Sequence, residues 1–96
     1  MFDGREVENM AQMIYFRGHV QGVGFRATAA SLGQQYGVCG WVRNLPDGRV
    51  QLWVQGEQDR VEQFLSSLRG KMEGYIEGEE SYEYPDEEME GFRIVR

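Results

Sequence analysis

The chain has 96 residues, with 41% hydrophobic and 27% charged residues, which is typical of one globular domain and excludes a disordered chain. No apolar run approaches the length of about 18 residues that spans a membrane, and the first dozen residues lack the apolar core of a signal peptide. A single cysteine, Cys39, excludes an internal disulfide and suits a reducing cytoplasm, and with one histidine the chain has too few ligands for an ordinary zinc site.

The formal net charge of −6 is unevenly distributed. Between Asn9 and Gly56 only Asp47 is acidic, against four arginines, whereas twelve acidic and five basic residues follow from Glu57 onward. One interpretation is a solvated acidic second half without functional meaning. The other is an anion-binding site in the first half, with the second half as scaffold. The charge pattern alone does not decide between them.

The pattern of apolar residues changes twice along the first part of the chain. Residues 1–11 show no periodicity, and we expect a flexible leader there, followed by a domain over residues 12–96. From residue 13 to residue 20 the even positions are apolar or small, which predicts a half-buried strand. After a glycine loop, apolar side chains recur at helical spacing until Gly37, a residue typical of helix ends. The helical positions are Phe25, Ala29, Leu32 and Tyr36.

Two strands, a second helix and two weaker strands follow. Pro-Asp-Gly at residues 46–48 lies between two β-rich stretches and predicts the turn of a hairpin. Residues 59–70 predict a helix with one apolar face, and Asp59 and Glu62 have the spacing of a capping box. Alternating residues predict further strands over residues 75–84 and 91–96.

The predicted order is strand–helix–strand–strand–helix–strand, with a short final strand. That is the split βαβ arrangement, so the predicted fold is α+β and ferredoxin-like, an antiparallel sheet with both helices on one face. Because this fold serves many functions, function has to be argued from particular residues.

The segment GHVQGVGFR, residues 18–26, joins the first predicted strand to the first predicted helix. Gly22 and Gly24 let the backbone curl and approach a ligand, and the N–H groups at the start of a helix lack partners within it. Arg26 is poorly placed in a first helical turn unless an anion binds between its guanidinium and those N–H groups. The residues alone fit an anion site and an ordinary strand-to-helix turn equally well.

Together with GWVRNLPDGRVQLWVQG, residues 40–56, this segment resembles the two signature motifs of the acylphosphatase family. The resemblance covers residues 13–96 and implies the ferredoxin-like fold. It also implies an enzyme that hydrolyses acyl phosphates to a carboxylate and inorganic phosphate. The chain departs from the family pattern in its long acidic leader and in the small Ala27, which could alter the shape of the substrate pocket.

The resemblance implies a role for each part of the two motifs. Arg26 would bind the substrate phosphate, and Asn44 would position the attacking water. The backbone of the loop would cradle the phosphate through Gln21, Gly22, Val23, Gly24 and Phe25. We expect no metal and no cofactor, because the sequence offers no cluster of ligands and Arg26 supplies positive charge. Without the resemblance, Asn44 is better interpreted as a cap of the following turn, and His19 as an exposed strand residue outside the mechanism.

Two other functions compete with hydrolysis. A nucleic-acid-binding module would stack bases on strand aromatics such as Tyr15 and Trp53, although a pI near 4.7 gives little attraction to a polyanion. A small-ligand domain would bind phosphate without turnover. We expect a cytoplasmic monomer that takes small acyl phosphates, with inorganic phosphate or sulfate as competitive ligands. Neither nucleic acid nor a membrane is an expected partner.

Overall fold

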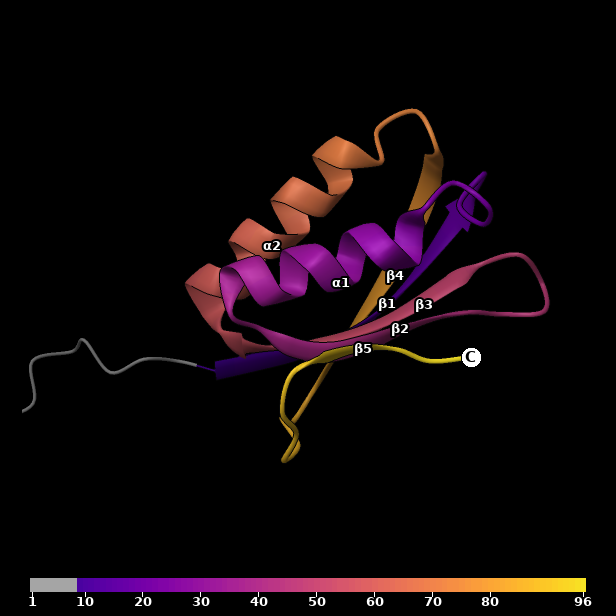
Figure 1. Ribbon diagram of the computed structural model, residues 1–96. Coiled ribbons are helices and arrows are strands. Elements are labelled where there is room, and N and C mark those ends of the chain that lie inside the picture. The colour runs from indigo at the N-terminus through magenta and orange to yellow at the C-terminus, as the bar shows by residue number, and fades with distance from the viewer. Residues whose placement is uncertain (1–8) are drawn as a thin grey trace, which may run out of the picture.

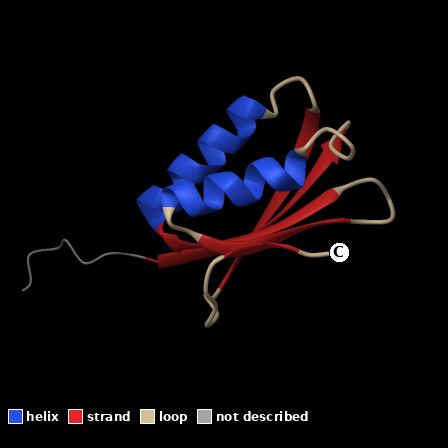
Figure 2. Cartoon of the chain, in the orientation of Figure 1, coloured by secondary structure: helices blue, strands red, loops and turns tan. Residues whose placement is uncertain are grey.

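Both helices lie on one face of a five-stranded sheet in the computed structural model, which describes residues 9–96 (Figures 1 and 2). The strands are β1 (Asn9–Gly18), β2 (Cys39–Asn44), β3 (Val50–Glu57), β4 (Ile76–Tyr84) and β5 (Phe92–Ile94). The helices are α1 (Phe25–Tyr36) and α2 (Gln58–Lys71). Within the described range, neither helix is long and apolar enough to cross a membrane. The α+β, ferredoxin-like order predicted from the sequence is confirmed.

The strands lie in the order β4-β1-β3-β2-β5. The pairs β1–β3, β1–β4 and β2–β3 are antiparallel, as expected, but β5 pairs with β2 in parallel, so the sheet is mixed. The parallel pairing arises because the chain leaves β4 at one edge and crosses to the opposite edge over the face away from the helices. There the backbone N–H of Glu87 donates to Oε1 of Gln55, 3.0 Å away.

The hydrophobic core lies between the two helices and the covered face of the sheet. Fully buried side chains from β1 and β3 meet the apolar faces of α1 and α2, each burial contributing about 1.5–3 kcal/mol. The largest buried side chains of the strands and helices in this core are Phe16, Phe25, Phe64, Ile14, Leu52 and Leu68. The rings of Phe16 and Phe25 lie 5.0 Å apart. Because Phe25 is the first residue of α1, this contact fixes where the helix begins above β1.

Two details differ from the sequence-based expectations. Residues 1–8 of the expected leader lie outside the described residues, whereas residues 9–11 belong to β1, where Ala11 is buried and pairs with β3 and β4. The prediction of a capping box formed by Asp59 and Glu62 is wrong. The helix α2 begins at Gln58 without a side-chain cap, so Asp59 lies inside its first turn, where a carboxylate complements the helix dipole instead.

The packing of β5 against α1 depends on a missing side chain at Gly33. A Cβ added there would collide with the Cβ and ring of Phe92. We predict that Gly33→Ala lowers the free energy of unfolding by about 1–3 kcal/mol, the usual cost of overpacking. In the control Gly70→Ala, on α2, the added methyl would meet no atom within 4 Å. This control should leave stability unchanged or raise it slightly, because alanine favours helix. Urea unfolding of both variants measures the difference, and equal stabilities would contradict the packing account.

Candidate active site

The loop between β1 and α1 bends at two glycines. Gly22 has a φ of 77° and Gly24 a φ of 81°, in the left-handed region where side chains other than glycine are strained. A Cβ added to either glycine would meet no atom within 4 Å. The backbone conformation therefore requires glycine at both positions, and the space beside them is open.

The helix α1 begins without any side-chain cap. Gly24 is its N-cap residue, no side chain accepts a hydrogen bond there, and the first turn contains no acidic residue. The first helical hydrogen bond runs from N of Thr28 to O of Gly24, 3.0 Å away. Within residues 9–96, no backbone carbonyl accepts a hydrogen bond from the N–H groups of residues 22–27. These donors and the positive end of the helix dipole together favour a bound anion.

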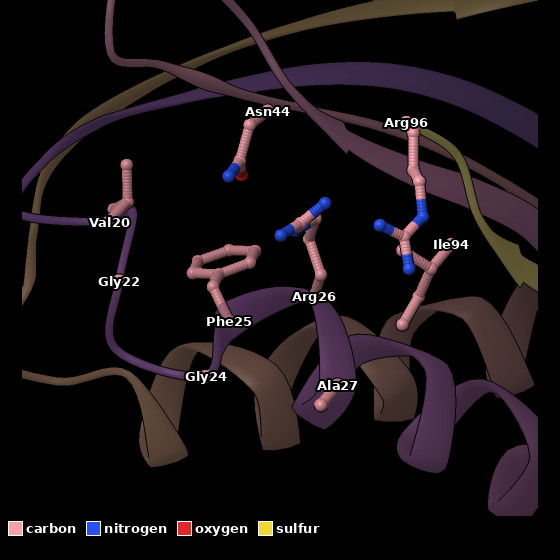
Figure 3. Close-up of a pocket in the computed structure, with 9 residues that line it drawn as sticks. All are labelled: Val20, Gly22, Gly24, Phe25, Arg26, Ala27, Asn44, Ile94 and Arg96. Atoms are coloured by element: carbon pink, nitrogen blue, oxygen red, sulfur yellow. The ribbon is translucent and has the colours of Figure 1, made fainter.

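Arg26 and Asn44 face the same hollow although they come from different elements. Arg26 lies in the first turn of α1 and Asn44 ends β2, and both are half-buried. Figure 3 shows the amide of Asn44 and the guanidinium of Arg26 pointing into one space beside the ring of Phe25. The hollow has a volume of about 260 Å³ and is lined by Val20, Gly22, Gly24, Phe25, Arg26, Ala27, Asn44, Ile94 and Arg96.

The turn that follows Asn44 is held by other groups. The N–H of Leu45 donates to O of Arg49 at 2.8 Å, and the N–H of Arg49 donates to Oδ1 of Asp47 at 3.0 Å. The hydrogen bond from the Arg49 backbone, assisted by the Arg49 side chain, holds the pKa of Asp47 below its ordinary value. The carboxylate therefore stabilises the turn at pH values above the ordinary pKa of an aspartate. This stabilisation is lost as the pH falls through the lowered pKa of Asp47 and the carboxylate becomes protonated.

Asp47, and not Asn44, is therefore the side-chain cap of this turn. In the described part of the chain, the Asn44 amide makes no hydrogen bond with another residue. The interpretation of Asn44 as a turn cap has no support in these contacts, and its amide is left to interact with whatever occupies the hollow.

The side chain of Gln21 holds the loop before α1 against the turn after Asn44, a role that the sequence did not predict. Its Nε2 donates to O of Leu45 at 2.9 Å and to O of Arg49 at 3.0 Å. One amide group thus ties the loop before α1 to the turn after Asn44. Gln21 and Val23 do not line the hollow, and Val23 packs against the core. No motif or spacing in the sequence predicts these hydrogen bonds of Gln21, because the accepting backbone carbonyls lie 24 and 28 residues away along the chain.

Ile94 and Arg96 also reach the hollow, and neither was a candidate in the sequence. Both follow the alternation of the last strand from Phe92, which places every second side chain on the helix side of the sheet. The alternation could have shown which side of the sheet Ile94 and Arg96 face. The sequence did not reveal that β5 pairs with β2, and this pairing is what brings the two residues close to Asn44.

The remaining candidates lie elsewhere. His19 is exposed and Cys39 is half-buried on β2. Among residues 9–96 there is no group of three or more His, Cys, Asp or Glu side chains that could hold a metal ion. Trp53 is 5% exposed and packs on Tyr84 at 5.6 Å, while the guanidinium of Arg49 lies 4.8 Å from the ring centre of Tyr15. Trp53 is thus too buried to stack a base, and Arg49 already occupies a position over the ring of Tyr15.

Comparisons with known proteins agree on one family. The sequence model of the Acylphosphatase family matches residues 12–94. An acylphosphatase of Roseiflexus sp. is 39% identical over 84 residues, covering 85% of this chain and 90% of that protein. An acylphosphatase of Trichormus variabilis is 37% identical over 84 residues, covering 86% of this chain and 83% of that protein. The crystal structure of acylphosphatase from Bacillus subtilis is similar with a TM-score of 0.82 at 27% identity, covering 91% of this chain and 99% of that one.

The two hydrogen bonds of the Gln21 amide can be tested by removing its donors. We predict that Gln21→Met lowers the free energy of unfolding by about 1 kcal/mol, the usual net value of a hydrogen bond. It should also speed hydrogen exchange at the N–H groups of Leu45 and Gly48, which close the turn. Gln35→Met, at an exposed position of α1, is the matched control. Unchanged exchange in the turn would show that Gln21 does not hold it.

Proposed function

The chain belongs to the acylphosphatase family, and from this premise we propose that it hydrolyses the carboxyl–phosphate bond of acyl phosphates in the hollow at the start of α1. The observation that carries the proposal is the joint lining of that hollow by Arg26, Asn44 and the loop glycines. The chain is an enzyme of the acylphosphatase type. The assignment of each step to a residue is our own.

Arg26 and the loop bind the reacting phosphate. The guanidinium offers two parallel N–H donors that match two phosphate oxygens, and the free N–H groups of the loop and first helical turn can donate hydrogen bonds to the other oxygens. Binding of the anion also removes the unfavourable interaction between the arginine and the helix dipole. This accounts for a cation in a first turn that has no acidic residue.

Asn44 orients the water that attacks phosphorus. Its amide is half-buried, points into the hollow and has no hydrogen-bond partner among the described residues. An amide is too weak a base to remove the proton of the water, so that proton passes to an oxygen of the substrate phosphate. The new bond joins the water oxygen to phosphorus as the bond from phosphorus to the acyl oxygen breaks.

The chemistry demands no general acid and no metal. The leaving group is a carboxylate, which is stable as an anion and departs without being protonated. Phosphoryl transfer then requires mainly positioning and fixed donors for the charge on the phosphate oxygens, and Arg26 with the loop supplies these. Gln21 supports the geometry by holding the loop and the turn of Asn44 together. Action as a monomer in the cytoplasm stays a prediction from the sequence.

A phosphate-binding domain without turnover is the main competing function. It would share the fold and the anion site, so binding measurements cannot exclude it. Turnover of benzoyl phosphate, a simple acyl phosphate, separates the two. Steady release of inorganic phosphate supports the enzyme, and saturable binding of phosphate without any release would overturn it.

We predict that Arg26→Ala and Asn44→Ala both abolish most turnover, for different reasons. Arg26 contacts the phosphate before and during the reaction, so its loss should also weaken inhibition by inorganic phosphate. Arg26→Lys should recover little, because a point charge lacks the two-pronged geometry. Asn44→Ala should lower kcat by roughly 100-fold or more, the effect of removing one positioned donor.

Inhibition constants for inorganic phosphate distinguish the two roles. In Asn44→Ala the constant should stay within a few-fold of the parent value, because Asn44 contacts mainly the water. Arg60→Ala removes the same charge from α2, away from the hollow, and serves as the control. Loss of phosphate inhibition in step with kcat in Asn44→Ala would make Asn44 a phosphate ligand and contradict its assignment to the water.

Exhaustive chelation should leave kcat and KM unchanged, because the charge of the phosphate is met by Arg26 and the loop. The measurement is turnover of benzoyl phosphate after treatment with a chelator, with and without added magnesium. A requirement for the metal would contradict the assignment of charge neutralisation to Arg26.

A further inference from the structure

Arg96 lines the same hollow as Arg26, but it comes from the segment after β5 and not from α1. It follows β5, whose pairing with β2 is continued by the hydrogen bond from N of Val95 to O of Val42, 2.9 Å away. Strand alternation sends Ile94 and Arg96 toward the hollow and Arg93 away from it. In Figure 3, Arg26 lies between the loop glycines and Arg96. The guanidinium of Arg96 is therefore farther from the loop glycines than the guanidinium of Arg26 is.

The lining of this hollow is positively charged. Two of its nine lining residues are arginines and none is acidic, although the chain has a net charge of −6. Within residues 9–96, the ion pairs join Arg49 to Asp47, Arg60 to Glu57 and Arg69 to Glu79. No Asp or Glu side chain of the described chain is therefore paired with Arg26 or Arg96. Two like charges around one hollow repel each other until anions lie between them.

We propose that Arg96 binds a second anionic group, carried on the acyl part of the substrate. This inference rests on the proposed function, in which the loop and Arg26 hold the reacting phosphate. The acyl part then extends past Arg26 toward Ile94, which is 44% exposed and offers an apolar contact, and its far end meets the Arg96 guanidinium. The preferred substrates are acyl phosphates of acids that carry another carboxylate or phosphate, over those with a neutral acyl group.

The test compares two rigid substrates of the same shape, 4-carboxybenzoyl phosphate and 4-carbamoylbenzoyl phosphate. They differ in one negative charge at the far end of the ring. The ratio of their kcat/KM values, compared between parent and variant, cancels the difference in intrinsic reactivity. We expect Arg96→Gln to lower this ratio by about 5-fold, the size of a partly exposed charge interaction. In the parent protein, the ratio should also fall as the salt concentration rises, because salt screens the attraction between Arg96 and the carboxylate of the substrate.

Arg93→Gln is the matched control, because it removes the same charge three residues earlier, on β5, from a side chain that does not line the hollow. Its ratio should equal that of the parent. A ratio unchanged in Arg96→Gln, or lowered equally in Arg93→Gln, would overturn the role of Arg96 while leaving hydrolysis intact. Failure of the parent protein to hydrolyse either substrate would instead overturn the proposed function and, with it, this inference.

Discussion

The uncapped start of α1 is the constraint on which the site depends. A helix leaves its first N–H groups without internal partners, and most helices satisfy some of them with a capping side chain. Here Gly24 occupies the cap position, Gly22 and Gly24 keep the loop in a left-handed conformation, and Arg26 adds positive charge to a first turn that is already positive. Each choice costs stability in an empty site, and a bound anion offsets all of them at once.

The rest of the fold holds this helix end in place and brings partners to it. Phe25 anchors the start of α1 on Phe16 of β1. Gln21 joins the loop before α1 to the turn that follows Asn44 and so ties two parts of the hollow together. The parallel strand β5 adds Arg96 at the edge of the sheet. The second half of the chain contains twelve acidic residues, but it contributes only Ile94 and Arg96 to the lining of the hollow.

Local pattern was sufficient to predict α1 and α2, because each buries one periodic face, and the Pro-Asp-Gly turn was sufficient to predict the β2–β3 hairpin. It was also sufficient to single out Gly22, Gly24 and Arg26, since these residues are unusual at a helix start. Spacing alone misplaced the cap of α2, because the strand before it runs directly into the helix. Tertiary contacts decided what remained: the amide of Gln21 meets carbonyls distant in sequence, and the crossover to β5 decides where Arg96 lies.

The central claim is that the backbone at the start of α1 holds the phosphate. Amide resonances of the labelled protein, followed while inorganic phosphate is added, test this residue by residue. The account predicts large, saturable shifts at the N–H groups of residues 22–27 and only small shifts on α2 and β4. Saturable binding with the largest shifts outside that segment, or no binding at concentrations that inhibit turnover, would contradict it.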